Sequence, residues 1–366
     1  MRKSIFLLFA SVCWIIGCSE DIREKSQVEG DMTAQSADPI RLGWQIPWAT
    51  QGQLVMGLKH SNITELTNTS LEYSGFAYGA PLNQAALAGH IDILLTADQP
   101  ALVLMNRDPS FKIVSRMMYN RVCLYVPPNS SIRTVGDLQG QRVSGPVGAA
   151  AERVALKTLS DARIDLEDIT FGNLGMAQQS ALLERHGANA KSWKDVDALY
   201  GFDPLPAIFE EKGFSRMLEC GPVVSVVVAR GEMLTKRREE LDNFITAFKL
   251  SWRLFADQPD KMNRIFASES RLEASNSVLN AAASIEPNRQ ATDFDSIRLT
   301  FSPDDLEVIK SANHFLHERG IIQKTVPLDT QINLSAAHDA DDDNRLNQLF
   351  RQVIVSAPQR STLEGE

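Results

Sequence analysis

The sequence predicts an α/β protein. Strand-like and helix-like segments alternate from Ile40 onward, which is the pattern of layered helices and sheet. The helix-like segments repeat their apolar residues with helical spacing, and glycine or proline marks several of their ends. The chain has 366 residues, enough for two lobes that each contain a core.

The first third of the chain supplies three strands and two helices. We expect strands at 39–45 ("PIRLGWQ"), 70–76 ("SLEYSGF") and 91–96 ("IDILLT"), the last of them buried. Residues 53–60 look helical. The segment "PLNQAALAG" places Leu82, Ala85 and Ala86 on one helix face, and Gly89 closes that helix as a C-terminal cap.

The middle of the chain continues the alternation. Strands are expected at 111–119 ("FKIVSRMMY") and 121–127 ("RVCLYVP"), followed by a helical turn and a strand in "TVGDLQGQRVSGP". A glycine loop then leads into a helix with an apolar stripe. "DVDALYGFDPLPAIFEEKGF" reads as strand, turn and helix, and "PVVSVVVAR" as a strongly apolar strand.

The last third turns helical. Six apolar residues form a sustained stripe: Leu241, Phe244, Ile245, Phe248, Trp252 and Phe255. A later helix starts at the cap Ser302 with Pro303 in its first turn, and it ends at Gly320. The acidic tail, 334–366, is expected to lie outside the core.

The N-terminus has the parts of an export signal. Arg2 and Lys3 precede an apolar run that is too short to span a bilayer comfortably. The ending Ile-Ile-Gly-Cys resembles a bacterial lipobox, so we expect residues 1–17 to be removed and Cys18 to carry lipid. An ordinary signal cut later, or an anchor kept whole, are the alternatives. Residues 18–38 are polar and predict a flexible tether.

The net charge bears on the binding partners, and the cysteine content bears on whether the chain has a disulfide. Loss of Arg2 and Lys3 with the signal moves the formal charge from −9 to −11, which argues against nucleic acid as a partner. Cys123 and Cys220 remain in the mature chain. Export permits a disulfide, but two lone cysteines in a large chain are more often buried thiols, and we expect thiols here.

The order of the segments resembles the solute-binding proteins of bacterial ABC importers for sulfonates, nitrate, taurine and thiamine-precursor pyrimidines. The resemblance rests on "RLGWQIPW", "PLNQAALAGHIDILLTADQPALV", "RVCLYVPPNSSIRTVGDLQGQRVSGPVGAAAERVALKTL" and "DVDALYGFDPLPA". It implies a periplasmic-binding-protein type II fold with two α/β lobes joined by two hinge strands. Lobe I would be 39–120 plus 230–333, and lobe II would be 121–229.

That family closes its lobes on a small ligand, and ligands of α/β sheets sit beyond the carboxyl ends of strands. Four loops qualify, and their candidate ligand-binding residues are Trp44, Gln45, Trp48, Asp98, Gln99, Gly148, Ala149, Ala150, Tyr200, Phe202 and Asp203. Each has a structural alternative. The tryptophans can pack in the core, Asp98 and Asp203 can cap helices, and the glycine loop can simply start its helix.

These loops offer aromatic rings, carboxylates and amides, but no Arg or Lys among the candidate residues. Arg121, beside the crossover between the lobes, is the nearest candidate cation. Glu152 follows the glycine loop and would repel an anion. A zwitterion or an organic amine therefore fits better than a bare inorganic anion, with a sulfonate or a small heterocycle also considered.

No enzyme motif stands out in the sequence. The HExxH and GxSxG patterns are absent, and the acidic stretch from Asp339 to Asn344 lacks the glycine and glutamate of a calcium loop. We expect no catalysis, metal or cofactor. The expected protein is a monomeric lipid-anchored receptor of the bacterial cell envelope. It faces the periplasm and serves an ABC permease and ATPase. A sensory or partner-regulating lipoprotein of the same fold is the alternative, and an enzyme is a third.

Overall fold

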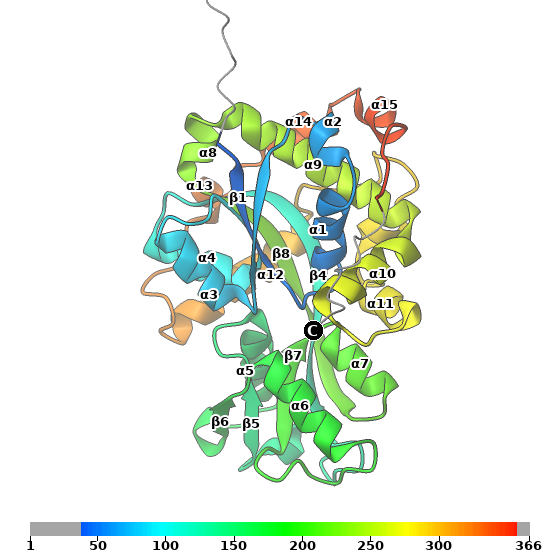
Figure 1. Ribbon diagram of the computed structural model, residues 1–366. Helices are drawn as coiled ribbons and strands as arrows, with labels where there is room; N and C mark the ends of the chain where they lie inside the picture. Colours follow the sequence, from blue (N-terminus) through cyan, green and yellow to red (C-terminus); the bar gives the residue numbers. More distant parts are fainter. Residues whose placement is uncertain (1–37, 357–366) are drawn as a thin grey trace, which may run out of the picture. The chain divides into compact units, whose positions relative to one another are not determined.

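The computed structural model describes residues 38–356, which belong to one compact unit built around a single mixed sheet (Figure 1). The predicted α/β class is confirmed. The sheet has eight strands in the order β2-β1-β3-β8-β4-β7-β5-β6. The strands are Ile40–Gln45 (β1), Leu71–Phe76 (β2), Ile93–Ala97 (β3), Lys112–Val126 (β4), Arg142–Gly145 (β5), Thr170–Asn173 (β6), Ala198–Phe202 (β7) and Arg216–Ala229 (β8).

Helices cover both faces of this sheet. The α-helices are Gln51–Lys59 (α1), Ile63–Leu66 (α2), Gly79–Leu87 (α3), Asp98–Arg107 (α4), Ala150–Asp161 (α5), Met176–His186 (α6), Leu205–Glu211 (α7), Gly231–Thr235 (α8), Arg238–Asp257 (α9), Pro259–Ser270 (α10), Asn276–Ala282 (α11), Pro303–Glu318 (α12), Leu328–Gln331 (α13), Ser335–Asp341 (α14) and Leu346–Phe350 (α15). Three short 3₁₀ turns are Val135–Leu138 (η1), Leu166–Asp168 (η2) and Pro287–Gln290 (η3).

Two long strands, β4 and β8, hold the sheet together. They pair antiparallel from Lys112 opposite Ala229 to Val126 opposite Arg216. β3 pairs with the end of β8, and β7 pairs with the far end of β4. The strands β1, β2 and β3 form what we call the first half of the sheet, and β5, β6 and β7 form the second half. We call the region where the residues that follow β1 and β3 meet those that follow β5 and β7 the junction.

The continuity of β4 corrects one prediction. The sequence suggests separate strands at 111–119 and 121–127, because the polar pair Asn120 and Arg121 interrupts the apolar pattern. In the structure both residues stay in the ladder, opposite Val223 and Pro222 of β8. A partner strand about a hundred residues away supplies the backbone hydrogen bonds, so the polar side chains do not end the strand.

Side chains of β8 alternate between two cores. Val223, Val227 and Ala229 pack in the larger core with α1 and α9, whereas Val224, Val226 and Val228 pack in a smaller core with α4 and α12. Because side chains alternate along a strand, Ser225 lies on the face of the larger core. Asn120 is opposite Val223 in the ladder, so it lies on that same face.

The cap of α12 follows its prediction. Ser302 Oγ accepts a hydrogen bond from the N–H of Asp305 at 3.2 Å, and Asp305 Oδ2 accepts one from the N–H of Ser302 at 2.7 Å. This reciprocal pair satisfies backbone donors that a helix start leaves free. Gly320 follows the helix with φ +67°, a left-handed conformation that glycine adopts without strain.

The segment after Asn333 is not outside the core, which corrects another prediction. Helix α14 packs against α9, and Ala336, Ala337 and Ala340 are buried there. Lys249 of α9, almost fully buried, donates to Asp341 at 2.6 Å and fixes the end of α14. Because acidic residues surround these alanines in the sequence, the short apolar face of α14 is not recognisable from the sequence pattern.

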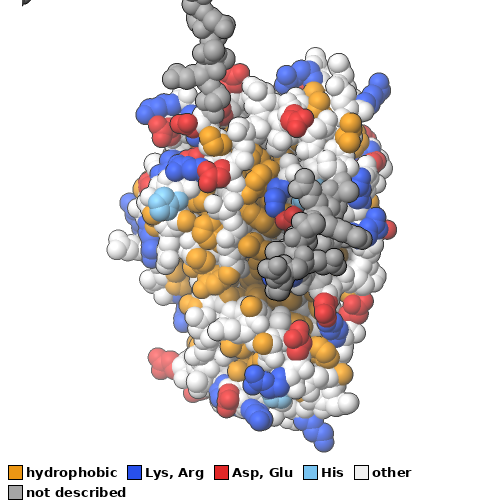
Figure 2. Space-filling view, in the orientation of Figure 1, with side chains coloured by type: hydrophobic (Ala, Val, Ile, Leu, Met, Phe, Trp, Pro, Cys, Tyr) orange, Lys and Arg blue, Asp and Glu red, His pale blue; other side chains and the backbone are white. Residues whose placement is uncertain are grey.

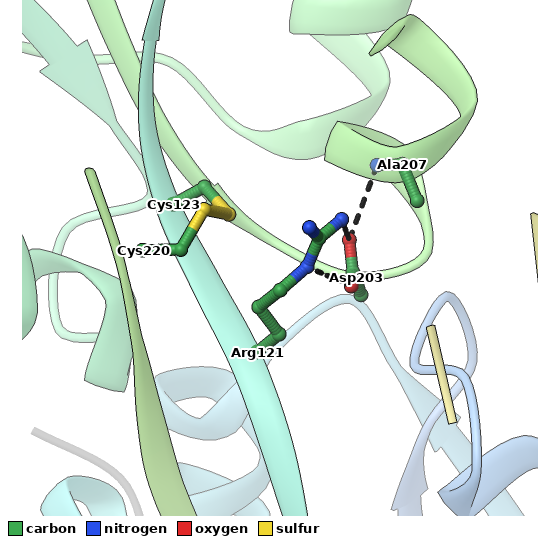
Figure 3. The surroundings of a disulfide bond; sticks show 5 residues. All are labelled: Arg121, Cys123, Asp203, Ala207 and Cys220. Carbon is green, nitrogen blue, oxygen red and sulfur yellow. Dashed lines mark hydrogen bonds and ion pairs between the residues drawn. A yellow bond between two sulfur atoms is a disulfide. The ribbon is translucent and has the colours of Figure 1, made fainter. Parts of the chain in front are cut away.

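The two cysteines of the described chain form a disulfide, which corrects the expectation of thiols. Cys123 and Cys220 are opposite each other in the β4–β8 ladder, and their Sγ atoms are 2.08 Å apart (Figure 3). The strand register brings together residues separated by 97 positions. Nothing in the local sequence around either cysteine reveals that register.

A buried ion cluster ties β4 to the segment that leads into α12. The Arg116 side chain has no exposed surface, and it donates to both oxygens of Glu286 at 3.0 and 2.8 Å and to Asp305 at 3.3 Å. Burial alone would raise the pKa of Asp305, but hydrogen bonds from Arg298, Tyr119 and the Ser302 backbone, with the charge of Arg116, hold it well below its usual range.

The surface carries charges of both signs. On the face in Figure 2, Lys and Arg side chains are interspersed with Asp and Glu. Between residues 38 and 356, none of the helices has both the length and the apolar character that a membrane span requires. The predicted signal, the tether up to Ala37 and the lipidation site Cys18 lie outside the described residues.

We predict that Arg116→Leu destabilises the fold by about 3–5 kcal/mol, because it leaves the buried Glu286 without its cation and removes one of the two arginines that pair with Asp305. Urea unfolding followed by circular dichroism measures this loss. Arg345→Leu is the matched control. It removes a largely exposed arginine from its pair with Asp343 and should cost at most about 1 kcal/mol. Equal losses in the two variants would contradict the interpretation.

Reduction of the disulfide should lower the free energy of unfolding by about 2–5 kcal/mol, because the bridge restricts a long loop of the unfolded chain. The measurement compares urea midpoints with and without dithiothreitol. In the double variant Cys123→Ala/Cys220→Ala the reductant should change nothing. A wild-type midpoint that ignores dithiothreitol would refute the prediction.

Candidate functional site

The predicted site residues lie at strand ends on both sides of the junction. Trp44, Gln45 and Trp48 end β1 or follow it, and Asp98 and Gln99 follow β3 in the first half. The remaining six come from the second half, where Gly148, Ala149 and Ala150 lead into α5 and Tyr200, Phe202 and Asp203 end β7 or follow it. All are buried except Gly148, which is partly exposed.

Trp48 and Phe202 join the two halves by an aromatic contact. Their ring centroids are 5.2 Å apart with an interplanar angle of 87°, an edge-to-face geometry. Trp48 is 1% exposed, and its indole Nε1 has no hydrogen-bond partner among the described residues. The Trp48 ring therefore packs in the core, as the structural alternative expected. Its indole N–H has no hydrogen-bond partner in the described chain.

Trp44 and Gln45 are positioned differently from Trp48. Trp44 pairs with Gly75 of β2 and packs in the larger core. The side chain of Gln45 lies on the opposite face of the sheet, because neighbours on a strand alternate. Its Nε2 is 3.4 Å from Thr96 Oγ1, and its backbone N–H donates to Gln51 Oε1 at 2.6 Å.

Asp98 meets a cation that the sequence analysis missed. Arg153 of α5 donates from Nη2 to Asp98 Oδ2 at 2.6 Å, and both side chains are at least 95% buried. The other carboxylate oxygen accepts from the N–H of Gln99 at 2.6 Å. This ion pair crosses the junction, since α4 follows β3 and α5 follows β5.

The start of α5 is occupied by its own side chain. The N–H of Gly148 donates to Glu152 Oε2 at 2.7 Å, which satisfies one of the donors proposed for a ligand. Gly148 has φ +81° and approaches Ala80 of α3, so the loop touches the first half closely. Burial raises the pKa of Glu152, although the Gly148 hydrogen bond lowers it in part.

Tyr200 and Glu152 influence each other electrostatically. Burial raises the pKa of Tyr200 well above its usual range, and the charge of Glu152 adds to the effect. The Tyr200 ring packs directly over Gly145, where a Cβ atom would collide with the ring. The phenol therefore stays protonated near neutral pH.

Asp203 caps a helix and pairs with a cation at the same time (Figure 3). Arg121 donates from Nε and Nη2 to its two oxygens at 2.7 and 3.2 Å, and the N–H of Ala207 donates to Oδ1 at 3.1 Å. Burial raises the pKa of Asp203, and Arg121 offsets part of that rise. The capping alternative is thus realised, and both oxygens already have partners.

Six of the fourteen buried polar side-chain atoms that have no partner within residues 38–356 lie on elements that border the junction. They are Trp48 Nε1, Gln51 Nε2, Gln99 Oε1, Asn120 Oδ1, Arg153 Nε and Ser225 Oγ. Ser225 is opposite Ala97, the residue just before Asp98, and Asn120 lies on the same face one step along the ladder. Because buried polar groups are normally satisfied, this set marks a place where a polar ligand would supply the missing partners.

Four of these residues were not candidates from the sequence: Gln51, Asn120, Arg153 and Ser225. Asn120 and Ser225 each interrupt an apolar strand, which was a usable signal. Arg153 lies three residues from buried Ala150 and three from buried Leu156, so it sits on the inner stripe of α5. A charged residue on such a stripe points to a buried ionic contact.

An open pocket of about 440 Å³ lies beside the crossover strands. It is lined mainly by Tyr119, Arg121, Pro222, Ile285 and Val308, and none of the predicted site residues lines it. Tyr119 and Val224 are opposite each other on the face away from Asn120, so this pocket and the side chains of Asn120 and Ser225 are on different faces of the two strands. Within residues 38–356, no group of three or more His, Cys, Asp or Glu side chains is arranged to hold a metal.

The NMT1/THI5-like family profile matches residues 82–262, which run from α3 into α10. No curated protein sequence matches this chain. Solved structures do match its fold. The alkanesulfonate-binding protein SsuA from Xanthomonas axonopodis pv. citri, bound to MOPS, aligns with a TM-score of 0.65 and 18% identity over 81% of this chain and 98% of that one.

Two further structures extend the comparison. The periplasmic aliphatic sulphonate binding protein SsuA from Escherichia coli aligns with a TM-score of 0.63 and 19% identity, covering 80% of this chain and 91% of that one. The desulfurization enzyme DSZB aligns with a TM-score of 0.56 and 15% identity, covering 86% of this chain and 99% of that one. Residues 82–262 therefore resemble the NMT1/THI5-like family, and the chain has the mixed α/β fold of the periplasmic binding proteins.

Proposed function

We propose that this protein is the solute-binding component of an ABC import system and clamps a small organic solute at the junction. Residues 39–120 with 230–333 would act as one lobe and residues 121–229 as the other, with β4 and β8 as hinge strands. Hinge closure around a small molecule is a common way to bury it between two rigid bodies.

The observation that carries the proposal is the set of unpartnered buried atoms at the junction. An indole N–H, a guanidinium N–H, a hydroxyl and amide groups stand on elements from both halves without partners in the described chain. Leaving such groups unsatisfied costs free energy, and a ligand that bonds to them recovers it. The edge-to-face contact of Trp48 with Phe202 adds an aromatic wall on which an organic body can rest.

The comparisons support the same function. SsuA from two bacteria binds sulfonates, and a ligand-binding component of an ABC-type import system from Staphylococcus aureus shares the fold at a TM-score of 0.64 and 16% identity over 83% of this chain and 99% of that one. We propose an organic solute that carries an acidic group, sulfonates being the first class to test. The zwitterions considered from the sequence belong to this class when they carry such a group.

We propose binding without catalysis. The fold is shared with a desulfurization enzyme, so the fold by itself does not choose between the two activities. The unpartnered groups favour binding, because amides and an indole N–H neither donate nor accept protons in ordinary acid–base chemistry. Ser225 Oγ has no hydrogen-bonded base among the described residues, and a serine nucleophile requires one.

The proposed location is the periplasmic side of a bacterial membrane, with the chain anchored through lipid on Cys18 and working as a monomer beside its permease and ATPase. The lipobox-like sequence supports the anchor. The mixed surface charge in Figure 2 fits a protein that has no nucleic-acid partner.

Native mass spectrometry of the full chain in detergent tests the proposed function. A bound organic molecule that dissociates on activation, or binding of ethanesulfonate, taurine or MOPS measured by calorimetry, is the expected result. A protein that arrives empty and binds none of these sulfonates would contradict the proposal. The intact mass also reports whether Cys18 carries lipid.

We predict that Trp48→Phe weakens binding of the ligand so identified by about fivefold, because the ring survives and one hydrogen bond is lost. Trp193→Phe is a closely matched control. Trp193 is also 1% exposed, packs edge-to-face on Tyr125 and has an unpartnered Nε1, but it lies far along the second half. The ligand affinity of Trp193→Phe should equal that of the wild type within the error of calorimetry. Equal weakening of binding in both variants would argue against a site at the junction.

A further inference from the structure

The ion pair between Arg153 and Asp98 differs from the other Arg–Asp pair of the site in how completely the arginine is used. A guanidinium has five N–H donors. Arg121 spends two nitrogens on both oxygens of Asp203, and its side chain is 27% exposed to water. Arg153 makes one bond, from Nη2, although its side chain is only 5% exposed.

At least one of the remaining donors of Arg153 is shielded from solvent. Its Nε is buried and has no partner among the described residues. Gln99 Oε1, in the residue next to Asp98, is likewise buried and without a partner. The two groups do not satisfy each other. A buried cation with unused directional donors, on the wall between two halves, has the chemistry of an oxyanion receptor.

Asp98 competes with an anionic ligand for this cation. Its carboxylate neutralises Arg153 in the empty site, and its charge would repel a second anion nearby. Asp98 is less suited to a cationic ligand, because its negative charge is already paired with the buried guanidinium of Arg153. The pair therefore offers more to an acidic group than to a basic one.

Taking the proposed solute-binding function as its basis, we infer that Arg153 is the specificity residue that holds the ligand's acidic group, and that Asp98 limits the affinity for that group. The sulfonate or carboxylate oxygens accept from the free donors of Arg153, and the organic body extends toward Trp48 and Phe202. The ligand class is an organic acid, with or without a second, basic group.

Calorimetry on the full chain in detergent, with ethanesulfonate, taurine and MOPS as probes, tests this assignment. Arg153→Met should weaken sulfonate binding by about 10- to 100-fold, since a charged hydrogen bond is lost. Asp98→Asn should strengthen it by several fold, because the competing charge disappears while the side-chain shape stays. The opposite directions of these two changes are the signature of the assignment.

Two controls keep the result interpretable. Arg142→Met and Asp197→Asn change another Arg–Asp pair in the second half, whose atoms are 2.9 Å apart but whose side chains are more exposed, and should leave binding within twofold. Arg153→Met leaves Asp98 as a lone buried charge, so the double variant Asp98→Asn/Arg153→Met is included. It removes both charges and should fold normally by circular dichroism, yet still bind sulfonate weakly.

Each of the following outcomes overturns the inference. Unchanged sulfonate affinity in Arg153→Met would leave Arg153 a purely structural role. Weakening in both single variants would make the pair a clasp between the halves rather than a receptor. Preference of the wild type for ethylamine over ethanesulfonate would reverse the ligand's charge. A wild-type protein that binds a non-acidic molecule overturns this assignment alone, whereas one that binds nothing overturns the proposed function with it.

Discussion

The antiparallel pairing of β4 and β8 is the constraint on which the rest of the structure depends. These strands connect the first half of the sheet, through β3, to the second half, through β7. Their register decides which side chains face which core, places Asn120 and Ser225 on one face, and sets the cysteines opposite each other. The strand ends that make the junction are positioned by the same ladder. A one-residue slip would exchange the two faces and remove both the bridge and the site.

Most of the fold could be predicted because most of it is local. Alternating apolar residues, the Ser302 cap and the glycines that end helices each act within a few positions of the chain, and the structure has those elements where the sequence indicates them. The three errors have a common origin. The continuity of β4, the disulfide and the packing of α14 on α9 depend on partners roughly a hundred residues away. No short stretch of sequence encodes such a distance.

The candidate site shows the same division. The strand-end rule selects loops from both halves, and the structure places Trp48 against Phe202 across the junction. The strand-end rule does not identify the arginines that pair with the carboxylates of these loops. Arg153 looks like one more charged residue on an amphipathic helix until Asp98, 55 positions earlier, is seen to reach it. The carboxylates that seemed to favour an amine, Asp98 and Asp203, are paired with arginines in the structure, which is why the proposed ligand carries an acidic group.

The bridge between Cys123 and Cys220 has a consequence for how the chain withstands proteolysis. It encloses almost the whole second half in a covalent ring, since β5, β6 and β7 and the helices between them lie between the two cysteines. A protease that nicks any surface loop in that ring leaves the fragments tethered to each other. The nicked molecule can then re-form its sheet without losing a piece, which would suit the proposed periplasmic location.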